Sequence, residues 1–157
     1  MTGPTVVFRV MTDDERIAYR DHAIEGYVTD LVRAGALDES AARLKAVRDY
    51  RGLAANDQAH WRHVVRDGEV VGALIWVVRA EDDGPVLFLD DIEIFEEHRG
   101  RGCGRATMKA LTVEAANAGA QAILLNVWSN NDAAQSLYDS MGFVVTNCHM
   151  RLDMSPR

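Results

Sequence analysis

The chain has 157 residues, of which 48% are hydrophobic and 26% charged, and its formal net charge at pH 7 is −7. This composition is typical of a globular protein with one hydrophobic core, so we expect residues 1–157 to form a single domain. An acidic chain lacks the basic face that contacts phosphate backbones, which argues against nucleic-acid binding.

Two cysteines, Cys103 and Cys148, are too few for a disulfide framework. The five histidines have no ligand-type spacing relative to them, so no metal site is expected. The N-terminal segment lacks the features of a signal peptide, and no apolar run is long enough to span a membrane. We therefore expect a cytoplasmic protein that has no membrane partner.

The first elements in chain order are a strand and a helix. Residues 5–10 read as the strand. Thr12 and Glu15 have the spacing of a capping box, which predicts a helix that begins at residue 13 and ends at Gly35.

A second helix and three strands follow. The helix is expected from about Asp38 over residues 38–53, with Leu44 and Val47 on one side. Residues 60–65 and 70–80 then predict a hairpin with a tight turn at Asp67 and Gly68, and residues 86–95 predict a third antiparallel strand.

The second half changes character after a glycine-rich loop. A helix is expected over residues 103–119, and the apolar run 122–128 predicts a strand buried on both faces. Strand, helix and strand in this order require a parallel pair with a right-handed crossover. A helix over 133–141 and a final strand pair, 143–147 with 148–154, complete the chain. The fold class is therefore α/β: a mixed, mostly antiparallel central sheet flanked by helices, with one parallel pair.

The loop between strand and helix reads EEHRGRGCGRAT. Glycines before a helix let its unpaired N–H groups approach an anion. A P-loop would need Lys and then Ser or Thr after the last glycine, where this chain has Arg105 and Ala106. The glycine spacing also fails the dinucleotide fingerprint, because Arg105 or Thr107 stands where Gly or Ala is needed.

Two motifs resemble the GNAT superfamily of N-acetyltransferases. Arg99, Gly102 and Gly104 match its RxxGxG loop, and NDAAQSLYDSMGF, residues 131–143, matches its NxxAxxxYxxxGF segment. Together they cover residues 86 to about 152, whereas the first half matches only in element order. Two residues depart from the pattern: Glu96 replaces a common proline, and Cys103 replaces a branched apolar residue.

The resemblance implies acetyl-CoA as cosubstrate and a mixed GNAT-like sheet in which the helix after the loop is the CoA-binding helix. The strand before the loop would hydrogen-bond the pantetheine arm through Ile92 and Ile94, at the usual β-bulge of the family. The implied cofactor-binding residues of the loop and the second motif are Arg99, Gly100, Arg101, Gly102, Cys103, Gly104, Arg105 and Asn131.

Amide formation requires a neutral amine and a proton donor for the departing thiolate. In the resemblance, Tyr138 occupies the position of that donor. Strand alternation places Asp91 and Glu93 on one face if no bulge intervenes. Glu93 is the first candidate for the base and Asp91 the second, while His60 and His63 are alternatives because a neutral imidazole can also act as a base.

The acidic balance and these carboxylates predict a small cationic amine as acceptor, acetylated directly without an acetyl-enzyme. Two alternatives stay open: acetylation of a protein N-terminus or lysine, and a non-catalytic acyl-CoA sensor. A homodimer is possible, because GNAT domains often dimerise.

Overall fold

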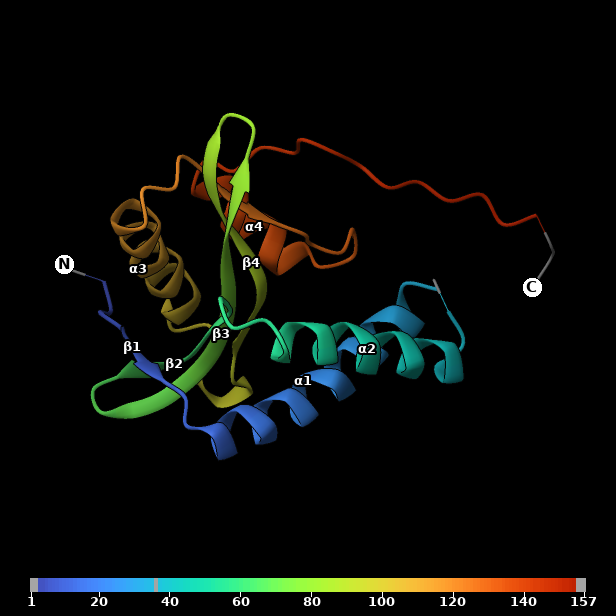
Figure 1. Cartoon of the computed structure of the whole chain (residues 1–157), viewed down its shortest axis with the longest axis horizontal. Helices are drawn as coiled ribbons and strands as arrows, with labels where there is room; N and C mark the ends of the chain where they lie inside the picture. The colour runs from blue at the N-terminus through green and yellow to red at the C-terminus, as the bar shows by residue number, and fades with distance from the viewer. Residues whose placement is uncertain (1–2, 36, 155–157) are drawn as a thin grey trace.

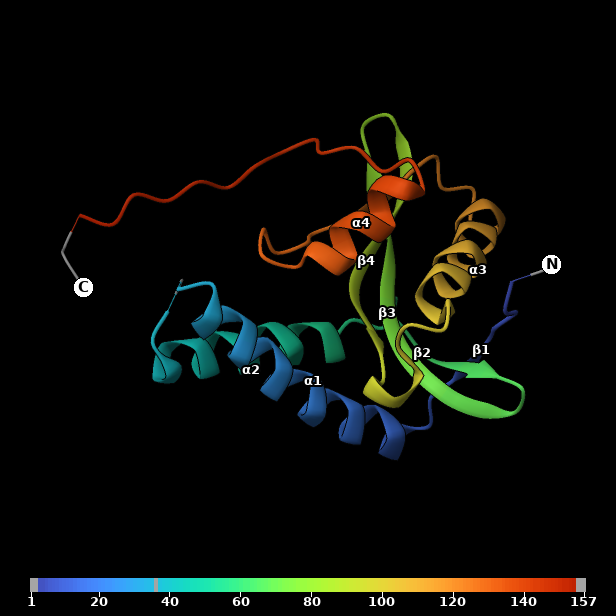
Figure 2. The same cartoon turned by 180° about the vertical axis from the view of Figure 1, so that it is seen from behind.

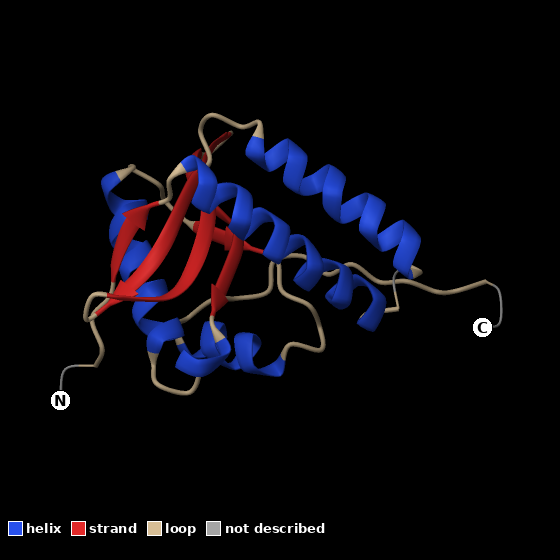
Figure 3. Ribbon diagram, turned by 90° about the horizontal axis from the view of Figure 1, so that it is seen from below, coloured by secondary structure: helices blue, strands red, loops and turns tan. Residues whose placement is uncertain are grey.

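The computed structural model describes residues 3–35 and 37–154. Its centre is a five-stranded sheet with the strand order β1-β2-β3-β4-β5 (Figures 1 and 3). Neighbouring strands are antiparallel except β4 and β5, which are parallel. The elements in chain order are β1 (Val7–Val10), α1 (Asp13–Arg33), α2 (Glu39–Ala54), β2 (His60–Arg66), β3 (Glu69–Glu81), β4 (Gly84–Ile94), η1 (Glu96–His98), α3 (Cys103–Asn117), β5 (Ile123–Leu125) and α4 (Asp132–Ser140).

The sheet has a hydrophobic core on each face. One core contains the buried side chains of α1 and α2, and the other contains those of α3 and α4. Figures 1 and 2 show α1 and α2 side by side and well separated from α3. The prediction of a mixed, mostly antiparallel sheet with one parallel pair joined by the helix after the glycine loop is confirmed.

The local signals at the ends of α1 are confirmed. The Glu15 amide donates to the Thr12 hydroxyl at 3.3 Å, and the Thr12 amide donates to the Glu15 carboxylate at 2.9 Å. This capping box satisfies two backbone donors that a helix start otherwise leaves unpaired. Gly35 follows the last turn with φ +68°, a conformation that glycine adopts without strain.

The side of α2 that carries Leu44 and Val47 is not the side that packs on the protein. The helix buries Ala42, Ala46 and Tyr50, whereas Leu44 is 75% exposed and Val47 also faces solvent. Alanines four residues apart lie on one face of a helix and let its backbone approach a neighbour closely. Ala42 and Ala46, rather than larger side chains, therefore occupy the face of α2 that packs closely on α1.

The β2–β3 hairpin has the predicted tight turn. Asp67 has φ +52° and Gly68 has φ +83°. Two successive positive φ angles are those of a type I′ turn, whose twist matches that of the flanking strands.

A β-bulge interrupts β4 at Asp90. Ile75 of β3 pairs with Asp91, but the next residue, Trp76, pairs with Leu89, which leaves Asp90 as the extra residue. From Asp91 to Ile94 the pairing is regular, so the expected bulge within residues 92–94 was wrong.

The predicted strand over residues 122–128 is much shorter in the structure. Only Ile123–Leu125 pair with β4, and their side chains are half-buried, so the prediction of burial on both faces was wrong. The reason is position: β5 lies at the edge of the sheet in the part of the chain that is described.

The predicted final strand pair, 143–147 with 148–154, was also wrong. Residues 144–154 form no strand or helix, and they extend away from the sheet past α4 (Figures 1 and 2). Val144, Val145, Met150, Leu152 and Met154 are each 78–87% exposed. A strand needs a neighbour for its backbone N–H and C=O groups, and this segment has no strand neighbour within the described chain. No helix in the described parts is long and apolar enough to cross a membrane.

Candidate active site

The glycine loop places unpaired backbone amides at the start of α3. Gly102 is the N-cap, with φ +79°, and no side chain caps the helix. The first capping hydrogen bond runs from the Ala106 amide to the Gly102 carbonyl at 3.0 Å. The amides of Cys103, Gly104 and Arg105 have no acceptor among residues 3–35 and 37–154. Such donors at the positive end of a helix dipole bind anions.

Gly102 and Gly104 are required for different reasons. Gly102 has a positive φ, and an added Cβ would lie 3.2 Å from Cγ of Pro4. Gly104 is helical, and its Cβ would lie 3.3 Å from Cδ2 of Leu137 and 3.9 Å from Cγ1 of Ile94. Gly104 thus permits close packing of α3 against α4 and β4.

Two arginines of the loop contact neighbouring elements. The Arg99 Nε donates to the Ile94 carbonyl at 2.8 Å, and its Nη2 lies 3.7 Å from the Glu93 carboxylate. The Arg105 Nη2 donates to the Ser140 hydroxyl at 2.6 Å. Arg99 therefore ties the loop to the end of β4, and Arg105 ties α3 to α4.

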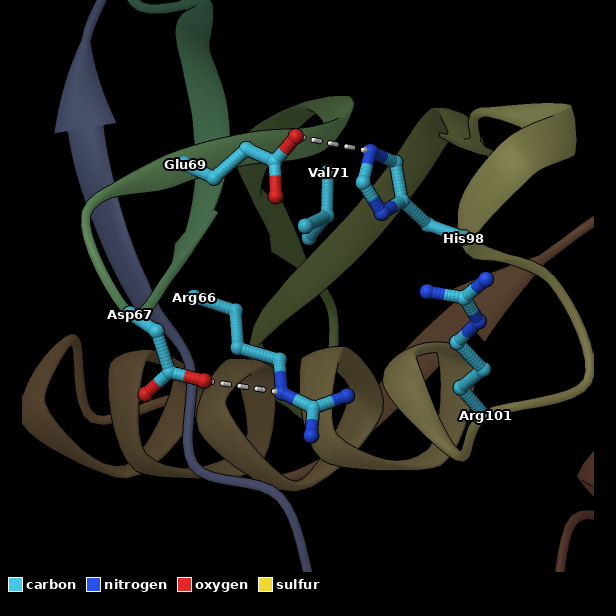
Figure 4. A pocket seen from close by; sticks show the side chains of 6 residues that line it. All are labelled: Arg66, Asp67, Glu69, Val71, His98 and Arg101. Atoms are coloured by element: carbon cyan, nitrogen blue, oxygen red, sulfur yellow. Dashed lines mark ion pairs between the residues drawn. The ribbon is translucent and has the colours of Figure 1, made fainter.

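Arg101 extends into a polar hollow of about 390 Å³ beside the loop (Figure 4). Two ion pairs cross its walls: Arg66 with Asp67 at 3.4 Å, and His98 with Glu69 at 3.7 Å. None of the predicted catalytic residues lines it. Its lining residues are Arg66, Asp67, Glu69, Val71, His98 and Arg101.

β4 extends beyond its pairing with β5. The parallel ladder ends where Leu89 pairs with Leu125, and β4 continues for five more residues to Ile94. In the described chain, no strand covers that side of residues 90–94. Apart from the Ile94 carbonyl, which accepts from Arg99 Nε, and the Ile92 amide, which hydrogen-bonds the Asp91 side chain, the backbone along this side of residues 90–94 can hydrogen-bond a bound molecule in line with the amides of the glycine loop.

Asp91 faces α1 and α2 and is held by tyrosines. The Tyr19 hydroxyl donates to the Asp91 carboxylate at 2.6 Å. Burial raises the pKa of Asp91, while hydrogen bonds from Tyr19 and Tyr50 act in the opposite direction. Burial and repulsion from Asp91 also raise the pKa of both tyrosines, so that they remain proton donors.

Glu93 lies on the same face, one residue pair further along β4. His22 of α1 contacts it, with Nε2 2.7 Å from the Glu93 carboxylate. The His22 side chain is 57% exposed, whereas that of Glu93 is 26% exposed. His22 therefore lies between the partly covered Glu93 carboxylate and solvent.

Tyr138 of α4 is buried against Phe143, with ring centroids 5.4 Å apart. Burial raises its pKa, and repulsion from the Asp91 carboxylate adds to this effect. Its hydroxyl has no hydrogen-bond partner among the described residues. Asn131 caps α4, because its side-chain oxygen accepts from the Ala134 amide at 3.1 Å. Asn131 therefore fixes the start of the helix that carries Tyr138.

An aromatic cluster lies beside the acids. Tyr27 is 6.2 Å from Tyr50 and 6.5 Å from Trp128, measured between ring centroids. The Lys45 ammonium lies 5.7 Å from the centre of the Tyr27 ring and also pairs with Asp49. The Tyr27 ring therefore already has one cation over it, as expected for the negative face of an aromatic ring.

A second hollow, of about 500 Å³, lies between the start of α1 and the sheet. The apolar part of its wall is formed by Ala18, Val70 and Phe95. Tyr19 and His22 also line it, and because they contact Asp91 and Glu93, the hollow and the two acids share a wall.

The structure separates the two candidate histidines. His60 stacks on Trp76 at 5.0 Å, in the core on the α3 side, away from the acids. His63 lies in the same cross-strand row as Glu93, with Ala73 between them, and its Nε2 is 3.6 Å from Glu15. Burial lowers the pKa of both imidazoles.

Three site residues were missed by the sequence interpretation: Tyr19, His22 and Tyr50. Tyr19 lies on the buried stripe of α1, and His22 lies one turn further along. The spacing of Tyr19 and His22 reveals their helix face, but nothing in the sequence pairs them with acids that are 72 and 71 residues away. No group of three or more His, Cys, Asp or Glu side chains suited to a metal ion occurs in the described parts of the chain.

The model of the acetyltransferase (GNAT) family matches residues 18–143. Two uncharacterized N-acetyltransferases of Bacillus subtilis are similar in sequence. YdgE is 25% identical over 146 residues, which cover 90% of this chain and 93% of YdgE. YycN is 27% identical over 153 residues, which cover 93% of this chain and 97% of YycN.

Solved structures share the fold. The crystal structure of YycN has a TM-score of 0.86 at 24% identity and covers 97% of this chain and 100% of that one. AAC(6')-Iy, solved with the bisubstrate analogue CoA-S-monomethyl-acetylneamine, has a TM-score of 0.61 at 19% identity. That comparison covers 96% of this chain and 99% of that one.

Proposed function

The chain belongs to the acetyltransferase (GNAT) family, and we propose that it transfers the acetyl group of acetyl-CoA to a primary amine of a small cationic acceptor. The observation that carries this proposal is the position of β4. Its end leads into the unpaired amides of the glycine loop, and its side chains Asp91 and Glu93 face α1, where they contact Tyr19 and His22.

The pyrophosphate of acetyl-CoA would accept hydrogen bonds from the amides of Cys103, Gly104 and Arg105. The uncovered edge of β4 at residues 90–94 would hold the pantetheine arm and donate to the thioester carbonyl, whose oxygen becomes negative during attack. AAC(6')-Iy, which shares the fold, binds a CoA-derived bisubstrate analogue. The direct contacts predicted for Arg99 and Asn131 with CoA stay predictions, since here both side chains position β4 and α4.

The acceptor amine would enter on the α1 and α2 face. Ionised Asp91 supplies a negative charge, and Tyr27, Tyr50 and Trp128 supply aromatic faces, a combination that attracts ammonium groups. The formal net charge of −7 acts in the same direction. An anionic acceptor would be repelled by Asp91 and Glu93 alike.

In the chemical step the amine nitrogen attacks the thioester carbon, and the carbon–sulfur bond breaks. We assign Glu93 as the base, which passes the amine proton to His22 and solvent. Asp91 is then the group that binds the ammonium form. Tyr138 donates a proton to the departing thiolate, and its raised pKa keeps it protonated through the neutral range.

A panel assay tests the function. Free thiol would be measured with acetyl-CoA and cationic, neutral and anionic amines, and with peptides that carry a free N-terminus or a lysine. We expect turnover with cationic small amines. Turnover only with neutral or anionic amines would contradict the acceptor class, and turnover only with peptides would favour protein acetylation.

Tyr138→Phe separates an enzyme from a sensor. The variant should bind acetyl-CoA as the wild type does in calorimetry, while kcat falls by about 10²–10⁴, the range of general acid catalysis. Tight acetyl-CoA binding by the wild type without turnover on any amine would favour a non-catalytic sensor.

A further inference from the structure

The Lys45 ammonium occupies part of the aromatic cluster formed by Tyr27, Tyr50 and Trp128. It pairs with Oδ2 of Asp49, four residues further along α2, and lies 5.7 Å from the centre of the Tyr27 ring. The Tyr27 hydroxyl donates to the same Asp49 oxygen at 3.4 Å. An aromatic face and a carboxylate oxygen thus hold one alkylammonium group of the chain itself.

Two neighbouring tyrosines of this cluster hydrogen-bond two different carboxylates. Tyr50 hydrogen-bonds Asp91, and Tyr27 hydrogen-bonds Asp49. The two rings lie edge to face, with their centroids 6.2 Å apart. The cluster therefore offers two anionic positions joined by aromatic surface, which is the complement of a molecule with an ammonium group at each end of an apolar chain.

The contact between Lys45 and Asp49 is one that a ligand can replace. The two side chains are 35% and 36% exposed, and an ion pair that water reaches stabilises a helix only slightly. Lys45 is one of only two lysines among the 17 lysine and arginine residues, and its flexible stem carries a compact charge. Arg48 lies 3.6 Å from the other Asp49 oxygen, Oδ1, and can stay there when Lys45 leaves.

We propose that Asp49 and Tyr27 form a second cation subsite of the acceptor site, and that Lys45 fills it until the distal ammonium of a diamine acceptor replaces it. This inference rests on the proposed function, in which Asp91 binds the ammonium group that is to be acetylated. The replacement conserves charge, because one alkylammonium leaves the Asp49 carboxylate and another takes its place. A monoamine fills only the Asp91 position and leaves Lys45 where it is, so the subsite selects acceptors with two ammonium groups.

Kinetics with acetyl-CoA and paired acceptors test the subsite. Diaminobutane and diaminohexane would be compared with butylamine and hexylamine, which lack the second ammonium. Asp49→Asn should lower kcat/KM for the better diamine about tenfold, through the loss of a charge-assisted contact, and leave the monoamines unchanged. Lys45→Met removes the competing ammonium and should raise kcat/KM for the diamine about twofold. Lys109→Met, on the exposed side of α3, is the matched control and should change neither. An equal loss for diamines and monoamines in Asp49→Asn would overturn the subsite.

A binding measurement separates this inference from the proposed function. Reductive methylation with isotope-labelled formaldehyde marks Lys45, Lys109 and the N-terminus and keeps the lysine charge, and Lys109→Arg identifies the Lys45 signal in NMR spectra. In the presence of CoA, which has no acetyl group to transfer, a saturating diamine should shift the Lys45 signal and a monoamine should not. A shift in a protein that acetylates no amine would support the subsite and contradict the proposed function. A Lys45 signal that diamines leave unmoved, in a protein that does acetylate amines, would overturn the subsite alone.

Discussion

Replacing Tyr19 by Phe tests which acid must be charged for catalysis. The substitution removes only the hydroxyl that donates to Asp91 at 2.6 Å and leaves the buried ring in place. A hydrogen bond to a charged group contributes about 1.5–3 kcal/mol. For a chain of 157 residues, each kcal/mol changes Tm by about 2–4 °C, so the melting temperature should fall by about 3–12 °C at neutral pH.

The sign of the pH dependence follows from the raised pKa of Asp91. An acid whose pKa is higher in the folded than in the unfolded chain gives up stability as the pH rises through the folded pKa. Tyr19 offsets part of this loss, because it stabilises the charged carboxylate. The destabilisation by Tyr19→Phe should therefore be largest above the folded pKa of Asp91 and smaller below it, where both proteins hold Asp91 protonated.

The activity measurement is the pH profile of kcat/KM, and the part that matters is its acid limb, where activity falls as the pH is lowered. If Asp91 must be ionised to bind the acceptor ammonium, the loss of the Tyr19 bond raises its pKa further and moves this limb to higher pH. Tyr27→Phe is the matched control on α1, because the Tyr27 hydroxyl donates to Asp49 at 3.4 Å. An acid limb that stays in place in Tyr19→Phe, despite the lower Tm, would refute the assigned role of Asp91.

Further predictions concern the base and the glycine loop. Glu93→Gln should lower kcat by about 10²–10⁴ with little change in acetyl-CoA affinity, as steady-state kinetics and calorimetry would measure. His22→Gln should lower kcat less, and an unchanged kcat would exclude His22 from the proton path. Gly102→Ala should weaken acetyl-CoA binding and cost about 1–2 kcal/mol of backbone strain in addition to its contact with Pro4. Gly100→Ala is the control, because Gly100 also has a positive φ but an added Cβ there would contact nothing. A smaller loss of Tm in Gly102→Ala than in Gly100→Ala would contradict the predicted contact with Pro4.

Local sequence signals predicted local structure well. The capping box at Thr12 and Glu15 and the tight turn at Asp67 and Gly68 depend on atoms within a few residues of each other, and all are present. The glycine loop and the order of strand, helix and strand were equally readable. They depend on backbone conformation and on the handedness of a short crossover rather than on distant partners.

Features that depend on distant neighbours were not predicted. The sequence does not reveal that α2 packs on α1 through alanines, while Leu44 and Val47, the apolar residues singled out on one side of the helix, face solvent. Apolar alternation in residues 143–154 indicated a strand pair, but residues 144–154 find no strand neighbour within the described chain. Tyr19 and His22 were missed because the acids they contact lie on another element, and only the packing of α1 across the sheet brings them together.

One inserted residue decides on which face of the sheet Asp91 and Glu93 lie. Before the bulge, Leu87 and Leu89 point into the core on the α3 side, and strict alternation would send Asp91 to the same side. Because Asp90 is an extra residue, the alternation of side chains shifts by one, and odd-numbered residues after it point to the opposite face of the sheet. Ile92 and Ile94 then continue the α3-side core, and the two acids face α1. β4 thus presents apolar side chains toward the helix that begins at the glycine loop and carboxylates toward the acceptor side. Its uncovered backbone at residues 90–94 is where the two substrates would meet.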